Sequence, residues 1–436
     1  MKQYKLLNNV VGGVVFLISL VTYLLTIEPT ASFWDCGEFI STAYKLEIGH
    51  PPGAPFFMLM ARFFTLFASD VHEVAKMVNI FSAFMSALTI LFLFWTITHL
   101  ARRLVIKAES DFTLGNTIAI LGAGTVGALA YTFSDTFWFS AVEAEVYASS
   151  SMFTAIVFWA MLKWEDVADR PFANRWLILI AYLMGLSVGV HLLNLLSIPV
   201  LVLVYYFRKF KFSWKGVGIS FAVSVVLLAV ILYGIIPGFV TVAGWFELLF
   251  VNVFGFSFNT GVIIYSIALI SCLVGGIYTS YSEKFEDSKL PTILFIASVA
   301  LLGIPFFGSH IVLGILILVA MAGYFFFTEK GRNTQMSLLN TVLTCLTVIL
   351  LGYSSYATLV IRSNANPPMD QNSPDDVFTL KSYLNREQYG DTPLLYGESF
   401  ASEFKYDRSG SVAKEYGEDL WAKKIKNNEN EPDEYY

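Results

Sequence analysis

The chain has 436 residues, of which 56% are hydrophobic, 16% aromatic and only 14% charged, and its mean hydropathy is +0.62. A soluble domain has about 25% charged residues, so these proportions exclude a soluble enzyme and a disordered protein. The net charge of −6 excludes a protein that binds nucleic acid through its phosphates. The composition therefore predicts an all-α polytopic membrane protein.

Charge is distributed unevenly along the chain. Residues 1–360 contain 19 basic and 19 acidic side chains, whereas residues 361–436 contain 9 and 15. The second segment is polar and has no apolar run long enough to cross a membrane. We therefore expect a transmembrane domain over residues 1–360 and a small soluble segment over residues 361–436.

The apolar runs predict the membrane-spanning helices, each of which needs about 20 apolar residues. The first run, Val10–Ile27, is not followed by a small-residue cleavage site, so we interpret it as a retained helix rather than a signal peptide. The later runs lie near residues 75–99, 114–132, 145–162, 176–190, 192–207, 216–236, 262–281, 292–307, 310–327 and 336–359. Together they predict about 11 transmembrane helices.

The basic residues predict the orientation of these helices. With an inner N-terminus, 16 basic residues of the first 360 fall in inner loops, and only Lys45, Arg62 and Lys76 fall outside. Such a bias is typical of cytoplasmic loops. It predicts a cytoplasmic N-terminus, and the odd number of helices then places residues 361–436 in a periplasm or lumen. The division of residues 176–207 into two helices is essential, because a single helix there would reverse every later loop.

The first outer loop contains an acidic motif directly after the first helix, with Asp35 and Glu38 three positions apart. On a helical turn the two carboxylates share one face, where burial and like charge raise the pKa of such a pair. This arrangement suits a general base, alone or with an orienting partner. The spacing fits a polar helix end in water equally well. Further along the loop, the short run Pro55–Phe67 contains Arg62 and predicts a helix at the membrane interface.

The second outer loop, Asp135–Tyr147, contains Glu143 and Glu145. Side chains two positions apart on a helix point to different sides, so we expect one of the two to face a cavity. Carboxylates near a bilayer are costly to keep and are therefore candidates for a function.

Several other polar residues of the outer side are candidates for contacts with substrate. A histidine can donate to a phosphate or a sugar hydroxyl, although a structural role is commoner for a lone histidine. The guanidinium of Arg62 matches phosphate oxygens, and snorkelling to lipid headgroups is the alternative. The candidate substrate-binding residues are His50, Arg62, Glu143, Tyr147, His191 and Asn194.

One apparent cofactor motif has another explanation. Residues Gly122–Gly127 match the dinucleotide fingerprint G-x-G-x-x-G, but they lie inside an apolar run with no preceding strand. Small residues that allow two helices to pack closely account for the pattern better.

The motifs together resemble a known group of membrane enzymes. An acidic motif after the first transmembrane helix, an interfacial helix in the first outer loop and an outer C-terminal segment are similar to the GT-C glycosyltransferases. More narrowly, Phe33–Phe39, Gly49–Pro55 and Glu143–Tyr147 resemble a bacterial membrane family of unknown function that is related to animal protein O-mannosyltransferases. The stretch Tyr383–Asp391, with Tyr396-Gly397, resembles the Bacteroidetes branch of that family.

The resemblance implies an inverting transfer of a sugar, mannose among the candidates, from a polyprenyl-phosphate donor to a protein or glycan acceptor at the periplasmic face of a bacterial inner membrane. It implies that Asp35 is the catalytic base, with Glu38 as its partner and Glu145 as a helper from the second loop. No Asp-x-Asp motif is present, so we expect catalysis without a metal and with no cofactor beyond the lipid-linked donor.

Two other functions fit a membrane protein of this composition. A secondary transporter predicts ionisable groups at mid-membrane and an inverted repeat, whereas the acidic residues here cluster in outer loops and the two halves do not match. A non-catalytic scaffold that presents the soluble segment is the second alternative. Longer relatives carry more soluble sequence after the membrane part, which predicts that this chain is a shortened member or a fragment.

Overall fold

The computed structural model describes residues 2–307, 309–390, 397, 399–413, 420–426, 428 and 431–436. Asp391 and Tyr396, which carry part of the resemblance, lie outside the described residues. The described part of the chain is built of helices, with three isolated β-bridges. The predicted all-α polytopic membrane protein is confirmed.

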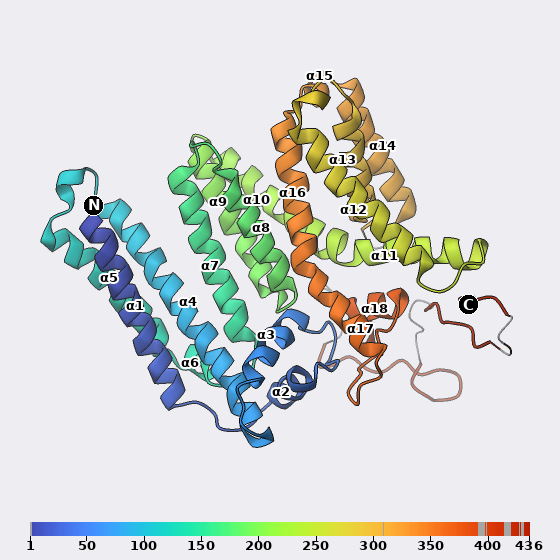
Figure 1. Ribbon diagram of the computed structural model, residues 1–436, viewed down its shortest axis with the longest axis horizontal. Coiled ribbons are helices and arrows are strands. Elements are labelled where there is room, and N and C mark those ends of the chain that lie inside the picture. The colour runs from blue at the N-terminus through green and yellow to red at the C-terminus, as the bar shows by residue number, and fades with distance from the viewer. Residues whose placement is uncertain are drawn as a thin grey trace.

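Apart from one helix that crosses the bundle, the long helices run side by side (Figure 1). Their bounds are α1 (Lys2–Leu25), α4 (Val74–Val105), α5 (Leu114–Thr132), α7 (Val146–Val167), α8 (Asn174–Val188), α9 (Ile198–Lys209), α10 (Trp214–Ala229), α11 (Ile236–Leu248), α12 (Thr260–Tyr281), α13 (Leu290–Leu301), α14 (Ile311–Phe327) and α16 (Met336–Tyr353). The shorter helices are α2 (Cys36–Lys45), α3 (Pro55–Thr65), α6 (Asp135–Ala141), α15 (Glu329–Arg332), α17 (Ala357–Ser363) and α18 (Val377–Leu384).

Each predicted apolar run coincides with a helix, and residues 176–207 divide into two helices as expected. Among the described residues, eight continuous helical segments are long and apolar enough to cross a membrane. Those over 174–188, 290–301 and 311–327 are shorter, so the number of spans stays a prediction. The run Pro55–Thr65 forms a short helix of its own, as predicted for the first outer loop.

The predicted span near residues 216–236 is part of a longer helical segment, Trp214–Val253. It contains two stretches of π-helix, Val230–Ile235 and Leu249–Val253, and Pro237 lies two positions after the first stretch. Proline and π-helical turns both bend helices. Helix α11 accordingly runs across the bundle at a steep angle to its neighbours (Figure 1).

Polar and small residues join the first helices of the bundle. Ser19 and Thr132 share a hydrogen bond of 2.9 Å between α1 and α5, and the Tyr23 hydroxyl donates to the Thr132 carbonyl. A Cβ at Gly124 would lie 2.4 Å from Thr98 of α4. A Cβ at Gly127 would likewise lie 2.7 Å from Ile97 of α4, whereas one at Gly122 would meet no atom within 4 Å. Two of the three glycines of the apparent dinucleotide motif therefore allow close helix packing.

The ends of the long helices and the short helices lie at two opposite ends of the bundle. The start of α1, the end of α7 and α15 lie at the upper end in Figure 1, whereas α2, α3, α6 and α17 lie at the lower end. The two predicted outer loops therefore meet at one end. Which side of the membrane this end faces stays a prediction.

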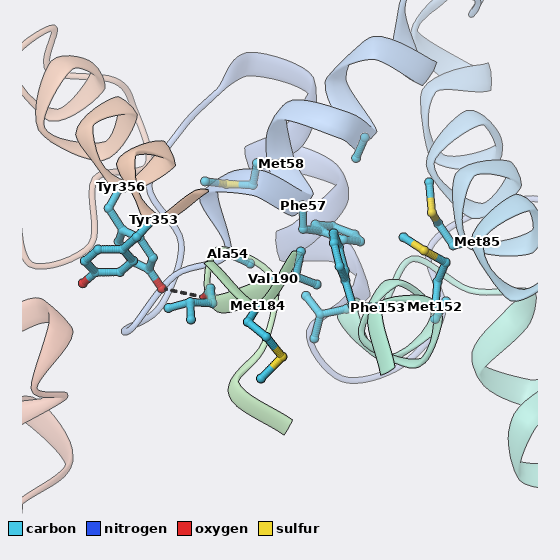
Figure 2. Packing of buried hydrophobic residues seen from close by; sticks show 14 of the residues in the cluster. Ala54, Phe57, Met58, Met85, Met152, Phe153, Met184, Val190, Tyr353 and Tyr356 are labelled. Atoms are coloured by element: carbon cyan, nitrogen blue, oxygen red, sulfur yellow. Dashed lines mark hydrogen bonds between the residues drawn. The ribbon is translucent and has the colours of Figure 1, made fainter. Parts of the chain in front are cut away.

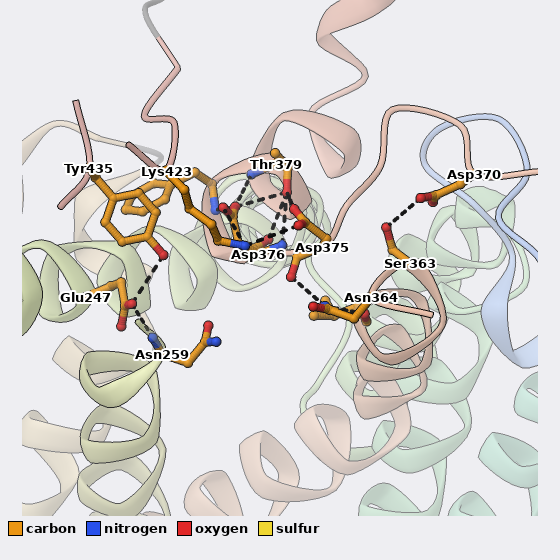
Figure 3. A network of polar contacts seen from close by, with 12 residues as sticks. Glu247, Asn259, Ser363, Asn364, Asp370, Asp375, Asp376, Thr379, Lys423 and Tyr435 are labelled. Carbon is orange, nitrogen blue, oxygen red and sulfur yellow. Dashed lines mark hydrogen bonds and ion pairs between the residues drawn. The ribbon is translucent and has the colours of Figure 1, made fainter. Parts of the chain in front are cut away.

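The segment after α17 packs against the membrane domain through the polar network in Figure 3. Asp376 caps α18 by accepting from the backbone of Phe378 and Thr379, each at 2.9 Å, and Lys423 pairs with it at 3.6 Å. The buried carboxylate of Glu247 in α11 accepts a hydrogen bond from Tyr435 at 3.3 Å. The division into two domains at residue 360 stays a prediction.

Candidate active site

A polar cavity of about 170 Å³ lies where the two predicted outer loops meet. The residues that line it come from α2, the loop before α3, the start of α7, the α8–α9 connection and the C-terminal segment. The polar and charged side chains among them are Asp35, Glu38, Thr42, His50, Glu145, Tyr147, His191, Tyr356 and Arg386.

Helix α2 carries the acidic motif. Asp35 is its N-cap residue, but its side chain makes no capping hydrogen bond and is exposed. Glu38 lies one turn later and also faces the cavity, as the three-residue spacing predicts. Asp35 therefore offers an uncommitted carboxylate at the mouth of the cavity.

Glu38 is bound to His50. Its Oε1 atom accepts hydrogen bonds from the His50 backbone and, at 2.9 Å, from His50 Nδ1. Burial alone would raise the pKa of Glu38, but the hydrogen bonds from His50 outweigh it and lower the pKa. The same hydrogen bond raises the pKa of His50, with burial acting against it. Each group favours the charged form of the other, so Glu38 is a partner for His50 rather than a free base.

The loop that carries His50 depends on two glycines. A Cβ at Gly49 would lie 2.5 Å from Glu38 Oε1, so only glycine lets the carboxylate approach the backbone. Gly53 has φ +74°, and a Cβ there would lie 2.7 Å from the Tyr383 hydroxyl. These close contacts explain the glycines of the Gly-His-Pro-Pro-Gly motif.

Tyrosines from the C-terminal part of the chain anchor this loop. The buried Tyr383 hydroxyl of α18 donates to the Gly49 carbonyl at 2.7 Å. The Tyr356 hydroxyl lies within hydrogen-bond distance of the Gly53 carbonyl of this loop, at 3.4 Å, and of the Val188 carbonyl at the end of α8, at 3.3 Å. Figure 2 shows Tyr356, Ala54 and Met58 as members of one buried hydrophobic cluster. The loop is thus held by residues far away in the sequence.

The two glutamates of the second loop differ, as their spacing predicts. Glu145 is the N-cap residue of α7 and lines the cavity, whereas Glu143 is buried and is not among the lining residues. The Cys36 thiol lies 3.7 Å from Glu145 Oε1. Burial, followed by the negative charge of Asp35, raises the pKa of Glu145 to about 7. Glu145 therefore exchanges protons near neutral pH.

The predicted substrate-binding residues divide into two groups. His50, Tyr147 and His191 line the cavity. Arg62 instead lies over the Tyr44 ring at 5.3 Å and donates to Thr65. Asn194 is fully buried and donates to Ser187 at 2.9 Å. The structure therefore places Glu143, Arg62 and Asn194 outside the cavity lining.

His191 has a defined tautomer. Its Nδ1 atom accepts a hydrogen bond from the Leu193 backbone at 3.1 Å. Burial, and then the charge of Arg386, lower the pKa of His191. The neutral ring therefore carries its proton on Nε2, which is available as a donor.

Arg386 supplies the guanidinium that the sequence prediction assigned to Arg62. It lines the cavity and lies over the Tyr389 ring at 4.9 Å. It belongs to the stretch Tyr383–Asp391 that carries part of the resemblance, which was the one sequence signal for it. Its contribution to the cavity depends on the packing of α18 against the first outer loop.

Three groups in the cavity could also hold a metal ion. One ligand atom each from Asp35, Glu38 and His50 lies within 4.8 Å of the others. Carboxylate oxygen and imidazole nitrogen are suitable donors for several divalent cations. In the structure, however, His50 Nδ1 and Glu38 Oε1 are already hydrogen-bonded to each other.

Comparison with known proteins identifies relatives of the region that holds most of the site. Residues 35–214 match the family described as "Protein O-mannosyl-transferase TMEM260 N-terminal domain". A Protein O-mannosyl-transferase tmem260 of Dictyostelium discoideum is 24% identical over 200 residues, which cover 44% of this chain and 22% of the relative. Protein O-mannosyl-transferase TMEM260 of Mus musculus is 25% identical over 173 residues, 40% of this chain and 22% of the relative.

The chain thus spans about a fifth of the length of the curated relatives it matches. No solved structure matches it. The matched region contains Asp35, Glu38, His50, Glu145 and His191, whereas Arg386 lies beyond it. The resemblance drawn from the sequence is confirmed, and this multi-pass membrane protein is related to the protein O-mannosyl-transferases through its N-terminal half.

Proposed function

We propose that the protein is a glycosyltransferase that moves a sugar, in the simplest case mannose, from a polyprenyl-phosphate donor to a hydroxyl of a protein or glycan. The observation that carries this proposal is one cavity in which the carboxylates of Asp35 and Glu145 face the cationic Arg386 and the donor His191. Such a site offers a base for an acceptor hydroxyl and stabilising groups for a leaving phosphate.

A second cavity supports a lipid-linked donor. It has a volume of about 550 Å³ and lies between α4, α5 and α7, with Leu93, Ile97 and Phe158 among its apolar lining. Tyr147 lines both cavities. A donor could therefore place its phosphate and sugar in the polar cavity and the first isoprene units in the apolar one.

Each residue of the cavity has its own role in the proposed transfer. Asp35 takes the proton of the acceptor hydroxyl, whose oxygen forms the new bond to the anomeric carbon. The bond from that carbon to the donor phosphate breaks, and the polyprenyl phosphate leaves with the electron pair. Arg386 and the Nε2–H of His191 stabilise the charge of this leaving group, and the Glu38–His50 pair fixes the loop around it.

The proposed setting is a bacterial inner membrane, with the N-terminus in the cytoplasm and the site and C-terminus at the periplasmic face. The 16 basic residues assigned to inner loops support this orientation. We further propose that the reaction needs no metal and no cofactor other than the lipid-linked sugar.

Sugar release from a panel of polyprenyl-phosphate sugars, with purified protein, tests the function. We expect turnover by the wild type and a loss of about 100-fold or more in Asp35→Asn, because general-base catalysis contributes about 10²–10⁴-fold. Asp135→Asn is the matched control, since Asp135 is an exposed carboxylate of the second outer loop and is not among the residues that line the cavity. Equal turnover in Asp35→Asn would assign the base elsewhere. No turnover with any donor would favour the scaffold function.

A further inference from the structure

A second polar cavity lies at the opposite end of the bundle from the candidate active site. It has a volume of about 490 Å³ and is lined by residues from the first half of α1 and the C-terminal parts of α4 and α7. These helix segments lie at the end of the bundle away from α2 and α3 in Figure 1. The lining residues of the cavity are Tyr4, Lys5, Asn8, Asn9, Trp95, Thr98, His99, Arg102, Trp159, Lys163 and Asp166. The proposed transfer reaction uses none of them.

The charge of this cavity is positive. Lys5, Arg102 and Lys163 line it, with Asp166 as the one carboxylate of the lining. Arg102 pairs with Asp166 at 3.4 Å, and Arg103, which is not among the lining residues, also pairs with it at 3.2 Å. Among the described residues, neither lysine has a carboxylate within ion-pair distance. Lys163 Nζ lies over the Trp159 ring at 5.2 Å, so within the described residues both ammonium groups lack an anionic partner.

Three polar atoms of the cavity residues lack hydrogen-bond partners within the described part of the chain: His99 Nε2, Trp95 Nε1 and Asn8 Oδ1. His99 is only 7% exposed, and its Nδ1 faces Asp166 at 3.7 Å. That carboxylate favours the tautomer with the proton on Nδ1, which leaves Nε2 as an acceptor. A buried polar atom without a partner is costly to keep, so a ligand that satisfies these atoms is favoured.

We propose that this cavity binds the headgroup of an anionic phospholipid whose headgroup carries hydroxyl groups. The phosphate would pair with Lys5 and Lys163. A bare phosphate offers few protons to acceptors, whereas headgroup hydroxyls donate to both Asn8 Oδ1 and His99 Nε2. The mixed set of donors and acceptors therefore selects a hydroxylated headgroup over a simple anion.

The position of the cavity favours a lipid over a soluble ligand of the same chemistry. It lies at the ends of three long helices that are apolar enough to cross a membrane. Tyr4, Trp95 and Trp159 form part of its wall, and tyrosine and tryptophan are enriched at the level of the lipid headgroups. Basic residues at helix ends also lie at this level.

Thermal unfolding of the full chain in detergent, with added lipid, tests the site. We expect phosphatidylglycerol to raise Tm in a saturable way, while phosphatidylcholine and phosphatidic acid, which lack headgroup hydroxyls, raise it less. Inorganic phosphate and soluble glycerol phosphate, at the same concentrations, are expected to leave Tm unchanged. An equal shift with either soluble anion, or with phosphatidylcholine, would overturn the proposal.

The double variant Lys5→Gln/Lys163→Gln is expected to weaken phosphatidylglycerol binding at least tenfold. The matched control is Lys211→Gln/Lys215→Gln, which removes the same charge from the α9–α10 connection and the first turn of α10, outside the cavity lining. Equal binding by both double variants would overturn the site. If the first variant does not fold, the lipid panel on the wild type still decides the question. Asp35→Asn should keep the lipid response, so this test is independent of the proposed transferase activity.

Discussion

Helix α7 contributes to two polar cavities, one near each of its ends. The cavities differ in whether their charged groups are paired with one another. Near the start of α7, Glu145 faces Asp35 and a Glu38–His50 pair, so that charges are partly buried and act on each other's pKa. Near its end, Lys163 has no carboxylate within ion-pair distance among the described residues, and the neighbouring His99 is left with an unpartnered nitrogen.

This difference separates a site suited to chemistry from a site suited to binding. Perturbed carboxylates are useful when a proton must move near neutral pH. Unpaired ammonium groups with uncommitted donors and acceptors are useful when an anion must stay bound. The variants below test whether the first cavity has the chemical character proposed for it.

The largest effect is expected at Arg386. Arg386→Gln should lower turnover about 100-fold, because removing one group that stabilises a developing negative charge costs about 10²–10³-fold. Arg62→Gln is the matched control, since Arg62 is engaged with Tyr44 and Thr65 outside the cavity lining. Sugar transfer by the two variants, at equal protein folding, measures the contrast. A larger loss in Arg62→Gln would return the phosphate-binding role to the sequence-based candidate.

Glu145 should make stability depend on pH. Its pKa of about 7 in the folded protein lies above the usual value, so folding favours the protonated form. That stabilisation is complete below about pH 4.5 and is lost as pH rises through 7. Glu145→Gln, which cannot ionise, should match the wild type at pH 4.5 and exceed it by up to about 3 kcal/mol at pH 8.

Apparent Tm in detergent at the two pH values is the measurement for Glu145. Glu109→Gln, an exposed glutamate at the opposite end of the bundle, is the control and should not change the pH profile. A gap between Glu145→Gln and the wild type that is the same at both pH values would show that the Glu145 pKa is not raised.

The acidic part of the site was predictable from the sequence, because the relative positions of its carboxylates follow from short spacings along the chain. Asp35 and Glu38 are three positions apart on one helix, and Glu143 and Glu145 are two apart, so helix geometry alone indicates which carboxylates share a face. The positions of the long helices were likewise readable from apolar runs. The bend between α10 and α11 was not, because hydropathy counts apolar residues and does not report the direction of a helix axis.

The rest of the site depends on contacts between distant parts of the chain. Arg386 reaches the cavity only because α18 packs beside the first outer loop, and no local pattern encodes that contact. Arg62 and Asn194 have suitable chemistry and lie near the right motifs, but their helices turn them toward Tyr44 and Ser187. The residue type and the side of the membrane predicted for its loop were therefore not enough to distinguish residues that line the cavity from residues with a structural role.

The Tyr383→Phe variant tests whether the C-terminal segment positions the Gly49–Gly53 loop. Tyr383→Phe leaves the carbonyl of Gly49 without its donor, and we expect a loss of about 1–2 kcal/mol in stability. It should also lower turnover, because His50 belongs to the same loop. Tyr435→Phe is the control, since it removes another buried hydroxyl, which donates to Glu247 away from the cavity. If both variants lose stability and neither loses turnover, Tyr383 has only a structural role.

The smallest effect is expected from removing divalent cations. A metal at Asp35, Glu38 and His50 would have to displace the hydrogen bond between His50 Nδ1 and Glu38 Oε1, which already satisfies two of the three ligands. It would also compete with the backbone N–H of His50, which donates to the same oxygen. Treatment with a chelator, followed by the sugar-transfer assay, should therefore leave turnover unchanged.

Loss of turnover after chelation, with recovery on addition of Mg²⁺ or Mn²⁺, would reverse this assignment. The carboxylates would then act as ligands, and the ion would supply the positive charge for the leaving phosphate that is otherwise assigned to Arg386. The two experiments are linked for this reason. If the ion carries the charge, Arg386→Gln should cost much less than 100-fold in turnover, whereas a large loss in that variant together with no response to chelation is consistent only with stabilisation by the protein's own side chains.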